Sequence, residues 1–212
     1  MTLRPRALVL ALAVALATSW AASAARAARP SLPAMSEQQM AKVHAGKVVL
    51  LTRRDGGEDS SEASVTGLVQ IRAPHEKVWG VLLDKRHSVA SSGAVKSVDV
   101  LSDATTPDGA RHMLLAWHLK VAFSDVVYHT KREYRAAERT MRWTLDKSRP
   151  NDIADTVGSY STHDASAPGA LYLLYSSRID TGRNIPKWIE EDLTESSLKR
   201  YLQYVKKVSE GG

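Results

Sequence analysis

Residues 189–208 read IEEDLTESSLKRYLQYVKKV, and apolar side chains recur in this stretch at every third or fourth position. That spacing predicts an amphipathic α-helix of about six turns with a single apolar stripe. Pro186 suits the first turn, acidic residues lie near the start, and Lys206 and Lys207 lie near the end, as the helix dipole favours. A long helix with one apolar stripe has to bury that stripe against another layer of the protein.

The chain before this helix alternates strand-forming runs with turn residues, which favours a meandering antiparallel sheet. We expect strands at residues 47–53, 64–72, 95–101, 111–119, 121–134, 140–146, 156–163 and 170–180. The fourth and fifth of these runs are two long strands or one continuous bent strand. In the second run, Val65, Gly67, Val69 and Ile71 share one face.

Two short helices are also predicted. Ser36 begins a capping box at the start of the first helix, which Gly46 ends. Pro74 suits the first position of the second helix, where Val78 and Leu82 follow at helical spacing. A curved sheet that wraps around one helix need not close its core, so this order of elements favours an internal ligand cavity.

Three sequence motifs carry a family resemblance. They are VQIRAPHEKVWGVLLD at residues 69–84, VKSVDVL at residues 95–101 and YSSRIDTGRNIP at residues 175–186. In this order they resemble the START-like (SRPBCC) superfamily, in the branch that holds polyketide cyclase/dehydrase and coenzyme-Q-binding domains. The resemblance implies an α+β helix-grip fold, in which a curved antiparallel sheet wraps around the long C-terminal helix. It also implies a lipid, quinone or polyketide-like ligand. The family often has an aromatic residue and a proline after the position of Asp84, and residues 86–94 have neither, so we expect a differently shaped cavity mouth.

The first 27 residues have the three parts of a secretory signal peptide. Arg4 and Arg6 precede an apolar run at residues 7–17, and two Ala-x-Ala cleavage sites end at residues 24 and 27. A retained membrane anchor is the alternative, because the apolar stretch could reach the roughly 20 residues that a span needs. Cleavage would leave an extension with a short helix at 28–46, a START-like ligand-binding domain at 47–208 and a tail at 209–212. We expect a periplasmic or extracellular protein.

Charge and composition narrow the choice of partners. The 212 residues include 29 lysines and arginines and 23 aspartates and glutamates, a formal net charge of +6. Removing residues 1–27 removes three arginines and no acid, which leaves 26 basic residues against 23 acidic ones, or +3. No basic run is interleaved with aromatic residues, so we expect no nucleic-acid partner. The absence of cysteine excludes disulfides, a thiol nucleophile and cysteine-ligated metals. The histidines lack metal-ligand spacing, and we expect neither a metal nor a cofactor.

The aromatic residues of the strands and of the last helix are the leading candidates for a ligand site. Tyrosine and tryptophan combine a large apolar area with one polar tip, which suits a ring-bearing lipid. The candidate cavity residues are Leu115, Trp117, Val126, Tyr128, Trp143, Tyr160, Leu173, Tyr175, Arg178, Trp188 and Ile189. The alternative for any one aromatic residue is an ordinary place in the core or at the surface. Arg178 could hold an anionic head group or pair with a surface acid.

No nucleophile elbow, phosphate-binding loop or dinucleotide motif is present, so we expect a noncatalytic binding domain. The alternative is an aromatase/cyclase-type enzyme that acts on a bound carbonyl compound. In that case Asp125 and His129, which share one face of their strand, would form an acid/base pair if that face lined the cavity. A third possibility is an envelope interaction module with a vestigial cavity. We expect a monomer, with transient membrane contact left open.

Overall fold

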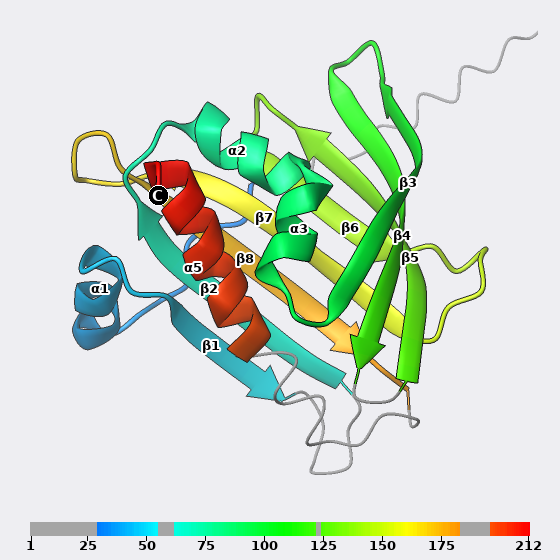
Figure 1. Cartoon of the computed structure of the whole chain (residues 1–212). Helices are drawn as coiled ribbons and strands as arrows, with labels where there is room; N and C mark the ends of the chain where they lie inside the picture. Colours follow the sequence, from blue (N-terminus) through cyan, green and yellow to red (C-terminus); the bar gives the residue numbers. More distant parts are fainter. Residues whose placement is uncertain (1–28, 55–61, 122–123, 183–195) are drawn as a thin grey trace, which may run out of the picture.

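The computed structural model describes residues 29–54, 62–121, 124–182 and 196–212 (Figure 1). Its elements follow one another as α1 (Glu37–His44), β1 (Val49–Arg54), β2 (Glu62–Ile71), α2 (His75–Leu83), α3 (Lys85–Ser91), β3 (Val95–Thr105), β4 (Ala110–Val121), β5 (Ser124–Arg135), β6 (Thr140–Leu145), β7 (Asp155–Asp164), β8 (Leu171–Asp180) and α5 (Ser197–Glu210). The eight strands form one antiparallel sheet in the order β1-β2-β8-β7-β6-β5-β4-β3. The predicted α+β architecture is confirmed.

Helix α5 lies against one face of the sheet, which curves behind it, and α2 and α3 lie beside it on the same face (Figure 1). We call this face the inner face. Leu198, Leu202 and Val205 of α5 are buried there, as the apolar stripe predicts. The helix approaches β2 closely at Gly67, where an added Cβ would lie only 2.6 Å from Leu202 Cδ1. The absence of a side chain at Gly67 therefore allows the helix to dock at this depth.

Helix α1 packs on the opposite, outer face of the sheet. Its Val43 is fully buried in a small cluster with Leu68 of β2 and Tyr172 of β8, and His44 Nε2 lies 2.9 Å from the Tyr172 hydroxyl. The predicted capping box is present, with the Ser36 side chain accepting from the backbone N–H of Gln39. Just before this helix, Arg29 donates a hydrogen bond to the backbone carbonyl of Thr162 on β7. The described part of the extension at 28–46 therefore contacts the domain at Arg29 and through α1.

Several element boundaries differ from the sequence prediction. The runs at 111–119 and 121–134 form two separate strands, β4 and β5. Helix α3 was not predicted; it begins directly after α2 because the Asp84 carboxylate accepts from the backbone N–H of Arg86 and caps a new helix. Helix α5 continues to Glu210, and Ser209 is fully buried, so the helix includes the first residues of the predicted tail. The predicted start of that helix lies outside the described residues.

The predicted signal peptide also lies outside the described residues. In the part of the chain that the structure describes, no helix is long and apolar enough to cross a membrane.

Candidate ligand cavity

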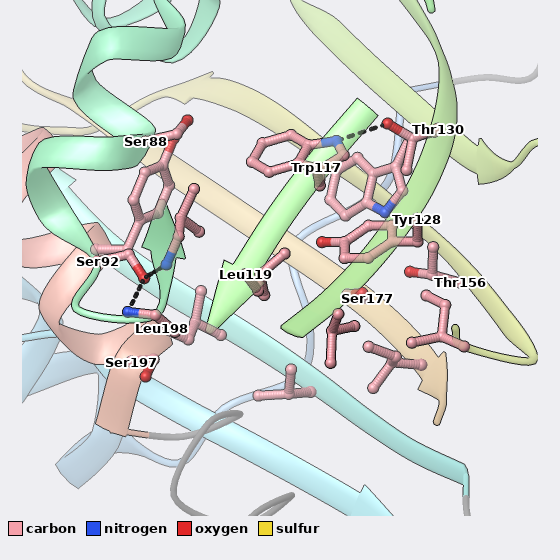
Figure 2. Close-up of a pocket in the computed structure, with 18 of the residues that line it drawn as sticks. Ser88, Ser92, Trp117, Leu119, Tyr128, Thr130, Thr156, Ser177, Ser197 and Leu198 are labelled. Atoms are coloured by element: carbon pink, nitrogen blue, oxygen red, sulfur yellow. Dashed lines mark hydrogen bonds between the residues drawn. The ribbon is translucent and has the colours of Figure 1, made fainter. Parts of the chain in front are cut away.

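A cavity of about 260 Å³ lies between the inner face of the sheet and helices α3 and α5. Figure 2 shows Trp117, Tyr128 and Thr130 of the sheet on one side and Ser88, Ser92 and Leu198 of the helical side across from them. Strand residues reach the cavity at every second position, as the pleat of a strand requires. The strand residues that line it are Val65, Val95, Trp117, Leu119, Val121, Val126, Tyr128, Thr130, Arg132, Trp143, Thr156, Tyr160, Tyr175, Ser177 and Ile179.

Six of the eleven candidates from the sequence line this cavity, namely Trp117, Val126, Tyr128, Trp143, Tyr160 and Tyr175. Contact between these side chains and a ligand stays a prediction. Trp188 and Ile189 lie outside the described residues.

The predicted cavity positions of Leu115, Leu173 and Arg178 are wrong. Leu115 and Leu173 are on the inner face, but each is fully buried in the main core, in the same cluster as Val78 of α2. Leu115 lies two residues before Trp117, and Leu173 lies two residues before Tyr175. At these positions other core side chains pack against the inner face and leave no open space. Arg178 is exposed on the outer face, because it is an odd number of residues from Tyr175 along β8.

The aromatic rings of the cavity form two groups. Tyr160 lies with its ring centroid 5.3 Å from Trp143, 5.1 Å from Tyr175 and 6.3 Å from Tyr201 of α5. Trp117 stacks on Tyr128 at 6.2 Å, with only 9° between the ring planes. These distances are those of favourable aromatic pairs. The rings therefore pack against one another and form much of the cavity wall.

The tyrosine hydroxyls of the cavity are neutral at physiological pH. Burial raises the pKa of Tyr128 to about 12, and it raises the pKa of Tyr160, Tyr175 and Tyr201 above the ordinary value. The hydroxyls of Tyr160 and Tyr201 hydrogen-bond to each other. These groups can donate hydrogen bonds to a ligand oxygen, but they are poor general bases at neutral pH.

Arg132 is the functional candidate that the sequence analysis missed. Its guanidinium carbon lies 4.5 Å from the centroid of the Trp117 ring and 5.3 Å from that of Trp143, in cation–π geometry with both. Trp117 is fixed in turn by a 2.9 Å hydrogen bond from its Nε1 to the Thr130 hydroxyl (Figure 2). Arg132 sits between Lys131 and Glu133, so its stretch of β5 reads as a charged surface. The sequence could have identified Arg132, because it lies four residues after Tyr128 and an even spacing along a strand places two side chains on the same face.

The acid/base pair of the enzymatic alternative is not in the cavity. Asp125 and His129 project from the outer face of β5, opposite to Tyr128. Lys120 Nζ lies 3.2 Å from the Asp125 carboxylate, whose side chain is 79% exposed, and His129 Nδ1 lies 3.0 Å from the backbone carbonyl of Pro150. These two residues therefore cannot act on a compound inside the cavity.

A second set of residues has the connectivity of a hydrolytic triad but not its accessibility. His75 Nδ1 lies 2.8 Å from the Thr162 hydroxyl, and His75 Nε2 lies 2.9 Å from the Asp164 carboxylate. Thr162 is fully buried, and its hydroxyl also accepts a hydrogen bond from Trp79 Nε1 at 3.0 Å. No substrate can reach that oxygen, so the set holds the start of α2 to β7.

Among the described residues, no group of His, Asp and Glu is arranged to bind a metal ion.

Comparison of the sequence with protein-family models and with curated proteins finds no match. Solved structures do resemble this fold. The STAR-related lipid transfer protein from Xanthomonas axonopodis superposes with a TM-score of 0.61 at 16% identity, covering 84% of this chain and 97% of that one. The Zhui aromatase/cyclase from Streptomyces sp. R1128 gives 0.57 at 17% identity, covering 70% and 94%. Human STARD10 gives 0.52 at 15% identity, covering 85% and 84%. The chain therefore has the helix-grip fold of START-like domains.

Proposed function

We propose that this protein is an exported START-like domain that binds a hydrophobic small molecule, such as a lipid, a quinone or a polyketide-like compound, without transforming it. The observation that carries the proposal is the cavity, because side chains of the sheet, α3 and α5 line it largely with aromatic rings and aliphatic groups. Such concave, mostly apolar sites with a few polar groups are typical of small-molecule binding. The likeness to the STAR-related lipid transfer protein supports a hydrophobic ligand.

Native mass spectrometry of protein purified from its own host tests the proposal. We expect a bound compound in the wild type and its loss in Ser177→Trp, because Ser177 lines the cavity and a large side chain would fill it. Ser176→Trp is the matched control, since it places the same side chain on the outer face of the same strand. No bound compound in the wild type, together with a crystal structure in which the cavity is filled, would contradict the proposal.

Export is supported by the charged, apolar and small-residue parts of residues 1–27. Protein recovered from the host envelope or culture medium should begin at Ala25 or Ala28, one residue after a predicted cleavage site. N-terminal sequencing decides this point. A cytoplasmic chain that begins at Met1 would overturn the export part and leave the binding part intact.

An aromatase/cyclase-type enzyme is the second candidate. Its supporting observation is the presence of Arg132 and several neutral tyrosine hydroxyls in the cavity, because such donors can stabilise negative charge that develops on a carbonyl oxygen. Incubation of the protein with the compound extracted from it, followed by mass analysis, separates the two candidates. A new product that disappears in Arg132→Met would favour the enzyme, and unchanged recovery would favour the binding domain.

A further inference from the structure

The cavity contains one charged side chain and no opposite charge among its described lining residues. Arg132 is that charge, and no aspartate or glutamate is among the described residues of the wall. No hydrogen bond or ion pair joins the Arg132 side chain to any residue in the described ranges, and its Nε atom is buried without a partner. The Arg132 side chain as a whole is half-buried, but a polar atom that is shielded from solvent, as its Nε is, is normally hydrogen-bonded because leaving it unpaired is costly. Cation–π contact with two indoles offsets only a part of that cost.

A second basic side chain, that of Lys85, lies close enough to Arg132 to interact with it electrostatically. Lys85 Nζ, at the start of α3, is also buried and without a hydrogen-bond partner among the described residues. Burial and the charges of Arg132 and Arg111 lower the pKa of Lys85, to about 7. The nearby Asp103 carboxylate is engaged by Arg111, 2.6 Å away, so it does not neutralise Arg132. Arg132 therefore carries the positive charge at this end of the described cavity wall, and Lys85 adds to it only when pH falls to about 7.

Arg132 also marks the inner limit of the cavity on β5. The lining residues of that strand run from Val126 to Arg132, and the next residue on the same face, Tyr134, packs against Trp79 of α2 at 4.8 Å. The other end of the cavity is aliphatic, with Val121, Val126, Ile153 and Ile179 in its wall. The cavity is thus cationic at one end of the strands and apolar at the other.

We infer that the ligand is an amphiphile with a carboxylate, which Arg132 binds at the inner end while the apolar part lies along Val126 and Ile179. This inference rests on the proposed binding function and specifies the ligand class. A planar guanidinium matches a carboxylate with two parallel hydrogen bonds, which gives both strength and orientation. The two indoles hold the guanidinium in place before the ligand arrives, so little side-chain entropy is lost on binding.

A matched pair of probes tests the inference, namely cis-parinaric acid and its methyl ester, titrated by fluorescence at pH 8. We expect the wild type to prefer the acid at least tenfold. Arg132→Met should lose that preference while its affinity for the ester stays within about twofold, and Arg132→Lys should fall in between. Arg178→Gln is the control, because it removes an exposed arginine from the outer face and should keep the full preference.

The outcomes separate this inference from the proposed function. Equal affinity of the wild type for acid and ester would overturn the carboxylate site while leaving the binding function in place. A preference for the acid that Arg132→Met retains would overturn the role of Arg132. If neither probe binds, the carboxylate site is overturned, while the proposed function is still decided by the compound that native mass spectrometry does or does not detect. The wild-type ratio of affinities needs no variant, so it remains decisive even if Arg132→Met does not fold.

Discussion

Lys85 is a side chain whose ionisation conflicts with its surroundings. The aliphatic stem of a lysine packs readily, but its ammonium group loses hydration when it is buried. Arg132 and Arg111 act on it with the same sign of charge, and the carboxylates of Asp84 and Asp103 offset them only in part. The consequence is a pKa of about 7, compared with 10.5 for an ordinary lysine.

This residue yields a prediction about the pH dependence of stability. Since the folded pKa is lowered, the unfolded chain binds the proton more tightly, and Lys85 destabilises the fold increasingly as pH falls from about 10.5 to about 7. Lys85→Met should therefore raise the free energy of unfolding at pH 7 by about 1–3 kcal/mol, and the gain should shrink toward pH 10.5. Urea denaturation at several pH values measures this difference. Lys199→Met, on the exposed side of α5, should show no such trend; a constant gain at all pH values would contradict the assigned cause.

The docking of α5 on β2 illustrates how two elements depend on one position. Gly67 lies on the inner face together with Val65 and Val69, and Leu202 of α5 occupies the space that a side chain at position 67 would need. Interiors are packed too tightly to accept an extra methyl group without displacement. The helix therefore depends on a missing side chain as much as on its own apolar stripe.

A double-mutant cycle tests this dependence. Gly67→Ala should destabilise the protein by about 1–3 kcal/mol through overpacking, and Leu202→Ala by about 2–5 kcal/mol through a cavity. The double variant should cost less than the sum, because the new methyl group partly fills the space that Leu202 vacates. Thermal or urea unfolding of the four proteins supplies the coupling energy. Strict additivity would show that the two positions do not share this space.

The helices and strands themselves could be predicted from the sequence, because the periodicity of apolar side chains that marks each one lies within a short stretch of chain. The strands and the apolar stripe of α5 follow from the spacing of side chains, and β2 has the predicted inner face. Helix α3 was missed because its signal is one capping aspartate, Asp84, that directly follows another helix. The arginine in the cavity was assigned wrongly, although strand spacing separates the two residues: Arg132 lies four residues after Tyr128 and shares its face, whereas Arg178 lies three residues after Tyr175 and does not. Whether an inner-face residue such as Leu115 or Leu173 lies in the filled core or lines the cavity depends on where α2 and α5 pack against the sheet. No local sequence pattern reveals that packing.

At the scale of the whole molecule, carboxylates at several places make the fold sensitive to acid. Ion pairs or hydrogen bonds lower the pKa of the carboxyl groups of Asp84, Asp103, Asp155, Asp164 and Glu210. The contact between Asp84 and Arg86 is local, but others join distant parts of the structure; the Glu210 carboxylate, for example, accepts from the backbone N–H of Arg72 at 2.8 Å and so joins the end of α5 to the end of β2.

The whole protein should therefore lose stability in acid. Because these folded pKa values lie below the unfolded ones, their contribution is present above pH about 4–5 and is lost as pH falls through the folded values. Urea midpoints measured from pH 7 to pH 2 should decline most steeply below about pH 4.5. Glu210→Gln should show a shallower decline, and a decline identical to that of the wild type would exclude a role for this contact.

The hydrogen bond from Arg29 to Thr162 has a consequence for the order of events during biogenesis. Only one residue separates Arg29 from Ala27, the second predicted cleavage point, so the cut would fall within about 7–10 Å of extended chain from the folded sheet. A peptidase has little room to engage a peptide bond that is only two residues from an Arg29 already bound to β7. If the leader is removed there, processing has to precede docking of the N-terminal extension, and a slow-cleaving variant would present the enzyme with an already folded, resistant substrate.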